Sequence, residues 1–298
     1  MNIDSPVIFS PGNRPAINTA RPGLPPWTIP AALADFTPME PIRLFDQFYY
    51  VGTRSVGAYL VSTADGLVMI DTGWNETDCA LFVAGMKQLG LNPRTIKLIL
   101  LTHEHIDHYG GVPYLKDNVC PEAKVALSLL GWNYMMTRPI EAAFGEPRPK
   151  SIDIFLRDRD QITQGQTTFH VVATPGHTPG CMSFIIPVTE NGEHHVVGLM
   201  GGVAVPLSWN EAFLYYSSID YFMGFARRFR CDIGLGTHAA YLEEAMKAVR
   251  SRQPSELNPL IIGPQRFESE YLQRYRDQFY STVNRLPAET VVVSALKK

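Results

Sequence analysis

IKLILLTHEHIDHY, residues 96–109, is the stretch that decides the fold of this chain. Its first part, residues 96–101, is apolar except for Lys97, which is typical of a strand buried on both faces of a sheet. The pattern H-x-H-x-D-H follows at residues 103–108, where the chain must leave the buried strand and begin a new element. The sequence therefore predicts a cluster of metal-ligating side chains at the end of a core strand.

The spacing within this cluster has a geometric meaning. Residues i and i+2 of an extended segment point to the same side, so His103 and His105 can face one cation. If a helix begins near Asp107, the side chains of Asp107 and His108 turn toward a second, adjacent position. We therefore predict two neighbouring metal positions.

Two later loops offer further histidines. His177 lies in TPGHTPG, residues 174–180, where glycines permit tight backbone turns and prolines stiffen the loop. His238 follows a predicted strand over residues 232–235; taken alone, it is equally compatible with an ordinary loop histidine. The remaining histidines are interpreted as structural or solvated: His170, His194 and His195.

These ligand types predict zinc. Three imidazoles leave the fourth position of a tetrahedral zinc ion open for water, which is the arrangement of catalytic rather than structural zinc. Asp107, His108 and another histidine would hold a second ion. We expect two Zn²⁺ ions per chain; the alternative is a set of surface or core histidines that bind no metal.

Composition excludes several other classes of protein. The 298 residues, 45% apolar and 18% charged, suit one large α/β domain or two closely joined halves. A net charge of −3 provides no basic field for nucleic acid, and no apolar run reaches the roughly 20 residues that a membrane-spanning helix needs. The four cysteines form no C-x-x-C pair, which excludes cysteine-rich zinc ribbons. We expect a small-molecule substrate and neither a nucleic-acid nor a membrane partner; the oligomeric state stays open.

The chain is expected to divide into an arm and a domain. Residues 1–40 contain a proline cluster and are predicted to form an N-terminal arm, and residues 41–298 are predicted to form the folded domain. The first 30 residues lack a basic region followed by an apolar one. The protein is therefore either cytoplasmic or the processed form of a periplasmic or secreted protein.

Apolar periodicity and turn residues predict the order of strands and helices. A helix over residues 78–89 is expected to begin at an Asn75 or Thr77 cap and to end at Gly90. Further helices are predicted over residues 218–229, 239–249 and 268–283. Strands are predicted over residues 42–51, 56–62, 67–70, 96–101, 168–174, 182–187, 195–200 and 232–235. Two similar β/α halves with polar residues at strand ends are the expected architecture.

H-x-H-x-D-H, the later TPGHTPG and the late Thr237-His238 together resemble the metallo-β-lactamase superfamily, from about Pro41 to the C-terminal helix. Within it the chain is most similar to subclass B3, through FYYVG at 48–52, IDTG at 70–73 and NPL at 258–260. The resemblance implies an αββα sandwich with a metal site along one edge. It also implies two ligand sets: His103, His105 and His177 for the first zinc, and Asp107, His108 and His238 for the second.

Residues 197–202 bear on the choice between branches of this superfamily. Many branches supply from this strand an aspartate that bridges both metals, whereas here GLMGGV at 198–203 contains no carboxylate. Its absence favours the B3-like ligand set over glyoxalase II thioesterases, typical acyl-homoserine lactonases and iron-dependent oxygen chemistry. Relatives in subclass B3 usually carry an Asp-Ser pair where this chain has Gly201-Gly202, and that serine supports the second metal and its water. The absence of this serine argues against β-lactam turnover.

Several residues near the motifs receive provisional roles. Asp107 is the expected catalytic residue, orienting the nucleophilic hydroxide and moving its proton. Asp71 is either a partner of a ligand histidine or a structural cap. Glu104 is expected to narrow or acidify the mouth of the site.

Substrate contacts are expected from aromatic residues. Trp74 and Tyr109 adjoin the metal motifs, and Phe144 lies in a segment, residues 132–150, that is predicted to form a flap over the site. Tyr215 and Tyr216 are candidates from the other half. Ordinary core packing is the alternative for each of these side chains.

The function predicted is that of a zinc-dependent hydrolase that opens a cyclic amide or ester. By resemblance the first substrate class is β-lactams, which would connect the protein with antibiotic resistance. The alternatives are a hydrolase of another ester, lactone or thioester with the same di-zinc site, and a non-catalytic relative of the fold that binds no metal.

Overall fold

The computed structural model describes residues 35–137, 148–238, 242–253 and 255–286. The predicted arm over residues 1–40 falls outside them except for residues 35–40, in which Pro38 forms an isolated β-bridge with Thr53. Within the described ranges, no helix is both long and apolar enough to cross a membrane.

Two sheets form the centre of the molecule. The first has seven strands in sequence order: β1 (Ile42–Phe45), β2 (Phe48–Gly52), β3 (Gly57–Thr63), β4 (Gly66–Ile70), β5 (Ile96–Leu100), β6 (Lys124–Ser128) and β7 (Ile154–Leu156). The second has five, in the order β12 (Ile233–Gly236), β11 (Glu193–Met200), β10 (Met182–Glu190), β9 (Thr167–Ala173) and β8 (Gln161–Gln164). From β4 to β7 the pairings are parallel, as is the pairing of β11 with β12.

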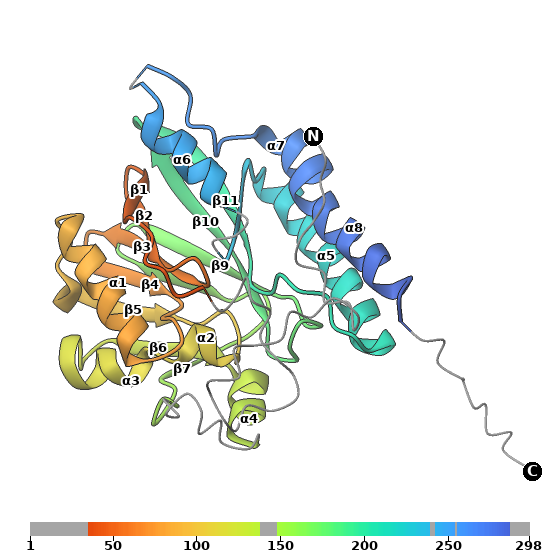
Figure 1. The fold of residues 1–298 in the computed structure, drawn as a ribbon, viewed down its shortest axis with the longest axis horizontal. Coiled ribbons are helices and arrows are strands. Elements are labelled where there is room, and N and C mark those ends of the chain that lie inside the picture. The colour runs from red at the N-terminus through yellow and green to blue at the C-terminus, as the bar shows by residue number, and fades with distance from the viewer. Residues whose placement is uncertain (1–34, 138–147, 239–241, 254, 287–298) are drawn as a thin grey trace, which may run out of the picture.

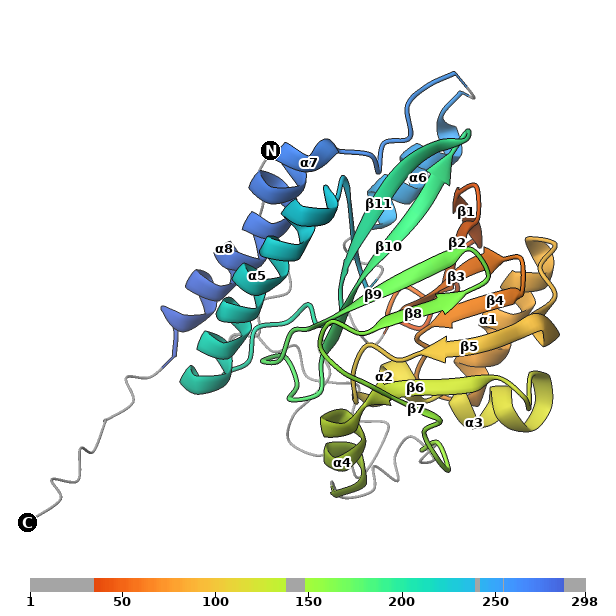
Figure 2. The same ribbon diagram turned by 180° about the vertical axis from the view of Figure 1, so that it is seen from behind.

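Helices cover the outer face of each sheet (Figure 1, Figure 2). On the first sheet lie α1 (Glu76–Gln88), α2 (Ile106–Tyr109) and α3 (Val112–Tyr114), with α4 (Leu129–Thr137) beyond β6. On the second lie α5 (Trp209–Phe229) and α8 (Gln273–Val283), while α6 (Glu243–Ser251) and α7 (Gly263–Arg266) lie at one end. Short turns of 3₁₀ or π helix occupy Pro93–Thr95, Leu115–Val119 and Phe267–Leu272.

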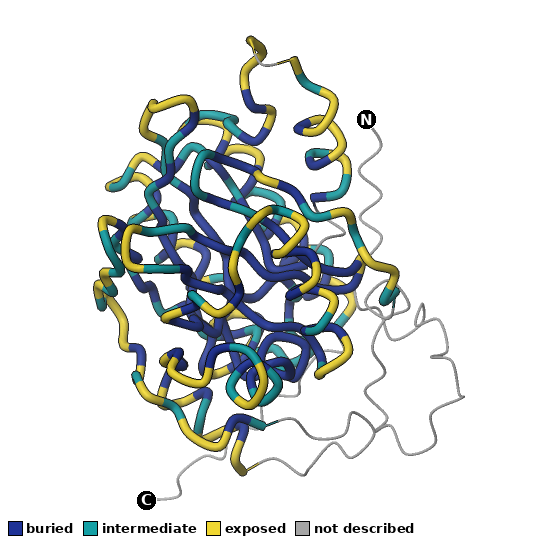
Figure 3. The backbone as a smooth tube through the Cα atoms, turned by 90° about the vertical axis from the view of Figure 1, so that its left-hand side faces the viewer, coloured by how far each residue is buried: buried dark blue, intermediate teal, exposed yellow. Residues whose placement is uncertain are grey.

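Alternation along the strands produces three clusters of core residues, one between the sheets and one under the helices on each side, and Figure 3 shows that the buried residues gather in the interior of the molecule. On β4, Val68 and Ile70 point between the two sheets, whereas Leu67 and Met69 point toward α1. On β10, Phe184 packs in the core between the sheets, whereas the next residue, Ile185, packs toward α5. This is the αββα sandwich of the predicted α/β class.

The predicted elements that carry the motifs are present, but the first strand prediction is wrong. Residues 42–51 are two strands, β1 and β2, joined by a turn at Asp46 and Gln47. Both turn side chains bond to the β10–β11 hairpin: Gly192 N–H donates to Asp46 Oδ2, and Thr189 N–H donates to Gln47 Oε1. The polar pair Asp46-Gln47 between two apolar runs was a local sign of this turn that the strand prediction overlooked.

Helix α5 begins at Trp209, well before the predicted residue 218. Its start is marked by SWNE, residues 208–211, in which Ser208 Oγ accepts from Glu211 N–H and donates to Glu211 Oε2. This is a capping-box pattern that the sequence offered and the periodicity argument missed. The strands β6, β7 and β8 and the helix α4 were also not predicted.

Candidate metal centre

The metal-ligating residues of the H-x-H-x-D-H motif lie where β5 gives way to α2. His105 is the residue before the first turn of α2 and keeps an extended backbone, with φ −81° and ψ 145°. His103 precedes it in the same loop, so the two imidazoles point to one side. Asp107 and His108 lie within the first turn of α2 and point to the neighbouring position. The local geometry is the one that the spacing predicted.

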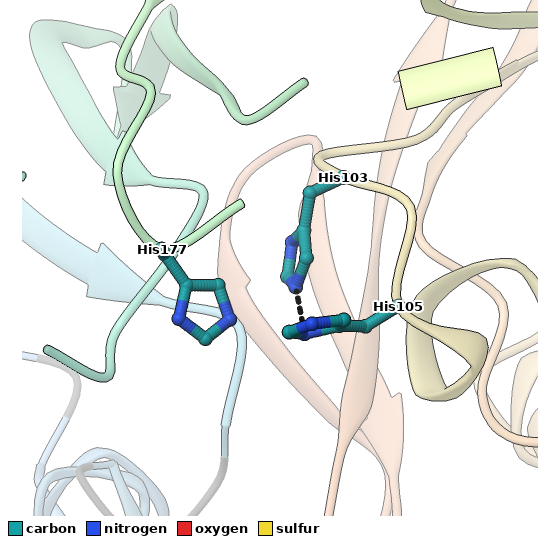
Figure 4. Close-up of side chains that lie close together, drawn as sticks. All are labelled: His103, His105 and His177. Carbon is teal, nitrogen blue, oxygen red and sulfur yellow. Dashed lines mark hydrogen bonds between the residues drawn. The ribbon is translucent and has the colours of Figure 1, made fainter. Parts of the chain in front are cut away.

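The first group consists of His103, His105 and His177 (Figure 4). His103 Nε2 lies 3.2 Å from His105 Nδ1. The His177 ring approaches the other two from the opposite sheet, with centroid distances of 4.7 Å to His103 and 4.8 Å to His105. One nitrogen from each of the three rings lies within 4.8 Å of the other two, which is the spacing that one ion requires.

The second group consists of Asp107, His108 and His238. Asp107 Oδ2 lies 3.2 Å from His108 Nε2 and 3.7 Å from His238 Nε2. The His103 and His108 rings, which belong to different groups, have centroids only 4.0 Å apart. The two groups are therefore adjacent, and all of their members except His105 and His177 are buried.

The remaining ring nitrogens fix the tautomers of three histidines. His177 Nδ1 lies 2.8 Å from the Ala204 carbonyl oxygen, and His238 Nδ1 lies 3.0 Å from that of Ser55. A carbonyl oxygen only accepts, so Nδ1 carries the proton and Nε2 keeps a lone pair for a metal. His108 Nδ1 donates in the same way to Asp71 Oδ2 at 2.8 Å.

Asp71 also reaches His103. Thr102 Oγ1 donates to Asp71 Oδ2 at 2.8 Å and lies 3.0 Å from His103 Nδ1, from which it accepts. One buried carboxylate thus orients an imidazole of each group, directly for His108 and through Thr102 for His103. Asp71 itself has a left-handed backbone, with φ 61°, which a non-glycine residue adopts rarely and often at functional positions.

These residues fit zinc. His108 Nε2 is buried and faces Asp107 Oδ2 at 3.2 Å, without the geometry of a hydrogen bond, so the two groups are placed as paired ligands of one ion or as an ion pair when His108 is protonated. Imidazole nitrogen and carboxylate oxygen are the ligand types that zinc prefers, and Cys ligands are absent from both groups. A metal ion held by the second group would satisfy that nitrogen.

The chain is similar to a known family and to solved structures over much of its length. Residues 51–190 match the family model of the metallo-beta-lactamase superfamily. The structure is similar to BJP-1, a subclass B3 metallo-beta-lactamase of Bradyrhizobium japonicum, with TM-score 0.69 and 25% identity over 84% of this chain and 96% of that chain. The chain belongs to the metallo-beta-lactamase superfamily. A second similar structure is GOB-18 from Elizabethkingia meningoseptica, with TM-score 0.67 and 25% identity over 88% of this chain and 98% of that one.

Curated relatives in the superfamily match a shorter part of the chain. The hydroxyacylglutathione hydrolase of Brucella anthropi is 33% identical over 110 residues, which are 37% of this chain and 35% of that protein. YobT of Bacillus subtilis, an uncharacterized protein, is 32% identical over 162 residues, 50% of this chain and 65% of that protein. The match thus spans about a third to two thirds of these relatives' own length.

Gly201 and Gly202 leave no room for side chains in this member of the superfamily. A Cβ atom on Gly201 would lie 1.9 Å from the Met182 carbonyl oxygen, and one on Gly202 would lie 2.4 Å from His177 Cβ. The backbone at these positions packs directly against the loop that carries a ligand histidine. The Asp-Ser pair of the B3 pattern does not fit this backbone without a shift.

We expect Gly202→Ala to displace His177. Overpacking of this kind typically costs about 1–3 kcal/mol, and here it acts on the ring of the first group. Zinc affinity of that group should fall, and thermal denaturation should report a lower midpoint. Gly224→Ala, on the exposed side of α5 with open space around it, is the matched control. Unchanged zinc binding in Gly202→Ala would contradict the close approach.

Without metal, the histidines of the site differ in pKa. Burial opposes the charged form of His108, but the carboxylates of Asp107 and Asp71 outweigh it and raise the pKa of His108 to about 10. Burial lowers the pKa of His177 to about 4, and it holds the pKa of His103 well below its usual range. At neutral pH, His108 is therefore protonated in the metal-free protein, whereas His103 and His177 are neutral.

Zinc affinity of the two groups should consequently differ in its pH dependence. An ion entering the second group must displace the His108 proton, so affinity there should rise by up to about tenfold per pH unit below the pKa of His108. His103 and His177 are already neutral in this pH range, so zinc binding to them releases no proton. They therefore add no pH dependence to the zinc affinity of the first group. Stepwise zinc titrations at pH 6, 7 and 8 check this, and equal slopes for both steps would contradict it.

The structure places the predicted substrate contacts in several environments. Trp74 and Tyr109 are buried in the core under α1, and Trp74 Nε1 donates to Ser55 Oγ at 3.0 Å. Core packing, the alternative for these aromatics, describes both side chains. Tyr215 is buried and donates to the Gly202 carbonyl oxygen. Phe144 lies outside the described residues, and residues 132–137 of the expected flap are the end of helix α4.

Glu104 does not lie at the mouth of the site, contrary to the expectation. Only 1% of the residue is exposed, and its carboxylate faces the loop that contains His177. The reason is the alternation of an extended segment: because His103 and His105 point to the metal position, the residue between them points the opposite way.

Proposed function

We propose that this chain is a di-zinc hydrolase of the B3 type that opens a cyclic amide or ester, with β-lactams as the first substrate class. The two adjacent ligand groups, one of three histidines and one of an aspartate with two histidines, carry the proposal. Zinc bound at such a pair lowers the pKa of water to near 7 and polarises a carbonyl group. The similarity to BJP-1, a subclass B3 metallo-beta-lactamase, over most of both chains supports the same conclusion.

Asp107 is the proposed catalytic residue. Burial opposes its ionisation, but His108 and His238 outweigh that effect and hold the pKa of Asp107 well below its usual range. The carboxylate is therefore ionised at neutral pH and accepts hydrogen bonds. In this role it orients the attacking water and receives a proton that can pass to the leaving nitrogen or oxygen.

A second candidate function is hydrolysis of a thioester or open-chain ester. It is favoured by the sequence match to the hydroxyacylglutathione hydrolase and by Gly201-Gly202, which replaces the Asp-Ser pair of B3 β-lactamases. The first proposal, a B3-type hydrolase, is favoured by the lack of a carboxylate in residues 197–202, since the bridging aspartate of thioesterases would come from this segment.

A substrate panel separates these functions. Penicillin, cephalosporin and carbapenem substrates are tested beside lactones and glutathione thioesters, each with the zinc-loaded chain and with chelator present. Chelator-sensitive turnover of a β-lactam supports the first proposal, and turnover of thioesters alone replaces it with the second. A chain that binds less than one equivalent of zinc and hydrolyses none of them is a non-catalytic relative.

A further inference from the structure

The loop that carries His177 is fastened at both ends. At its start, Ser218 Oγ donates to the Pro175 carbonyl oxygen at 2.6 Å, and Gly176 packs against the Tyr215 backbone of α5. In the middle, His177 Nδ1 bonds to Ala204. The end of the loop, residues 178–180, has no anchor on the second sheet among these contacts; it is fastened to the first sheet instead.

Glu104 makes that attachment. Thr178 Oγ1 donates to Glu104 Oε2 at 2.9 Å, and Gly180 N–H donates to Glu104 Oε1 at 3.0 Å. Each carboxylate oxygen thus receives one loop donor, and hydrogen bonds to an ionised acceptor are stronger than neutral ones. The contacts join residues 74 and 76 positions apart in the chain.

Ser128 holds the same end of the loop, at Gly180, through a second contact. Ser128 Oγ, at the end of β6, donates to the Gly180 carbonyl oxygen at 2.7 Å and accepts from Gly131 N–H at 2.9 Å. A Cβ atom on Gly180 would lie 2.3 Å from Gly131 Cα, so the two backbones touch here. The loop end is therefore held in a narrow gap between Glu104 and the start of α4.

We infer that Glu104 is a positioning residue for the first metal group. It stands between His103 and His105 in the chain and bonds to the residue after His177 and to Gly180. This carboxylate thus helps to set the position of the third imidazole relative to the first two, together with the Ser128–Gly180 contact and the backbone bond from Met182 N–H to the Thr102 carbonyl oxygen. The second group has no such link among the described contacts, because its third member, His238, is held by Ser55. This inference rests on the proposed metal-dependent function.

Glu104→Gln tests the inference at almost constant volume. The Gly180 N–H can only donate, so it needs the amide oxygen, and the NH₂ group then faces Thr178 Oγ1. The Thr178 hydroxyl must reverse from donor to acceptor, and both bonds lose the carboxylate as their acceptor. We expect zinc affinity of the first group to fall by up to roughly tenfold, the low end of the effect of removing a direct partner of a ligand, because Glu104 acts through the backbone of the His177 loop. Affinity of the second group should not change. In the metal-free full chain, amide hydrogen exchange in peptides spanning residues 174–181 should become faster.

Stepwise zinc titration against a chromogenic chelator gives both affinities, and His105→Ala identifies the step that belongs to the first group. Glu190→Gln is the matched control. Glu190 is a buried carboxylate at the far end of β10, ion-paired with Arg252, and makes no contact with either group. Glu190→Gln should alter thermal stability but leave the ratio of the two zinc affinities unchanged. Thr178→Val removes one donor from the other side, and in the double variant with Glu104→Gln the losses should be less than additive.

The outcomes distinguish this inference from the function on which it rests. If the wild-type chain binds no zinc, both are overturned. If the wild-type chain binds two ions and Glu104→Gln retains wild-type affinity at the first step, only the role of Glu104 is overturned. Equal weakening of both steps, as general destabilisation would produce, also overturns it.

Discussion

Replacing His105 with alanine is expected to abolish hydrolysis and to remove one of two bound zinc ions. His105 Nδ1 lies 3.2 Å from His103 Nε2, and among the described residues His105 is one of only three that form this group. The loss should exceed the roughly 10–100-fold effect of removing an outer partner of a ligand, because a ligand itself is removed. Metal analysis by mass spectrometry and turnover of the best substrate from the panel measure the two effects.

The control for this variant is His194→Ala. His194 is an exposed histidine near the β10–β11 turn, far along the strand from the site, so its loss should leave zinc content and turnover unchanged. Circular dichroism should report the wild-type fold for both variants. A His105→Ala protein that keeps two zinc ions and full activity would refute the assignment of the first group.

Asp71→Asn is expected to weaken both zinc sites. Asp71 bonds directly to His108 and through Thr102 to His103, so an amide in its place disturbs one imidazole in each group. We expect a loss of about 10–100-fold in zinc affinity. Asparagine tolerates the left-handed backbone of this position, which separates the effect on the metal groups from backbone strain.

A second Asp–His pair in the same chain provides the matched control for Asp71→Asn. His195 Nδ1 lies 2.6 Å from Asp232 Oδ2, away from both metal groups. Asp232→Asn should therefore lower the free energy of unfolding without a change in zinc affinity. Zinc titration and chemical denaturation of both variants give the comparison. If Asp71→Asn behaves like Asp232→Asn in both measurements, Asp71 is a structural residue only.

The spacing of His103, His105, Asp107 and His108 indicated two adjacent metal positions because these four residues lie in one local segment, whereas His177 and His238 were assigned to them through the family resemblance. His103 and His105 share a side through the alternation of an extended segment, and Asp107 and His108 follow in the first turn of a helix. The buried strand before them and the glycine-rich loop around His177 indicated where each ligand would leave the core. The sandwich followed from the resemblance that these motifs carry.

Several features near the site could not be predicted, because they depend on contacts between segments far apart in the sequence. The Ser55 carbonyl that orients His238 is 183 residues away from it. The close approach of Gly202 to His177 exists only once β11 lies beside the TPGHTPG loop. Away from the site, the turn at Asp46 and Gln47 likewise takes hydrogen-bond partners from the opposite sheet.

The sequence by itself determined how the candidate ligands of residues 103–108 are directed, because His103 and His105 are two positions apart in an extended segment and Asp107 and His108 are adjacent at the start of a helix. Only the tertiary structure decided what holds those side chains in place. Glu104 turned from an expected feature of the site mouth into a buried link between two loops, and Asp71 became the shared partner of two histidines. Hydrogen bonds between distant segments have no signature in local periodicity, and they form only when the two sheets pack together.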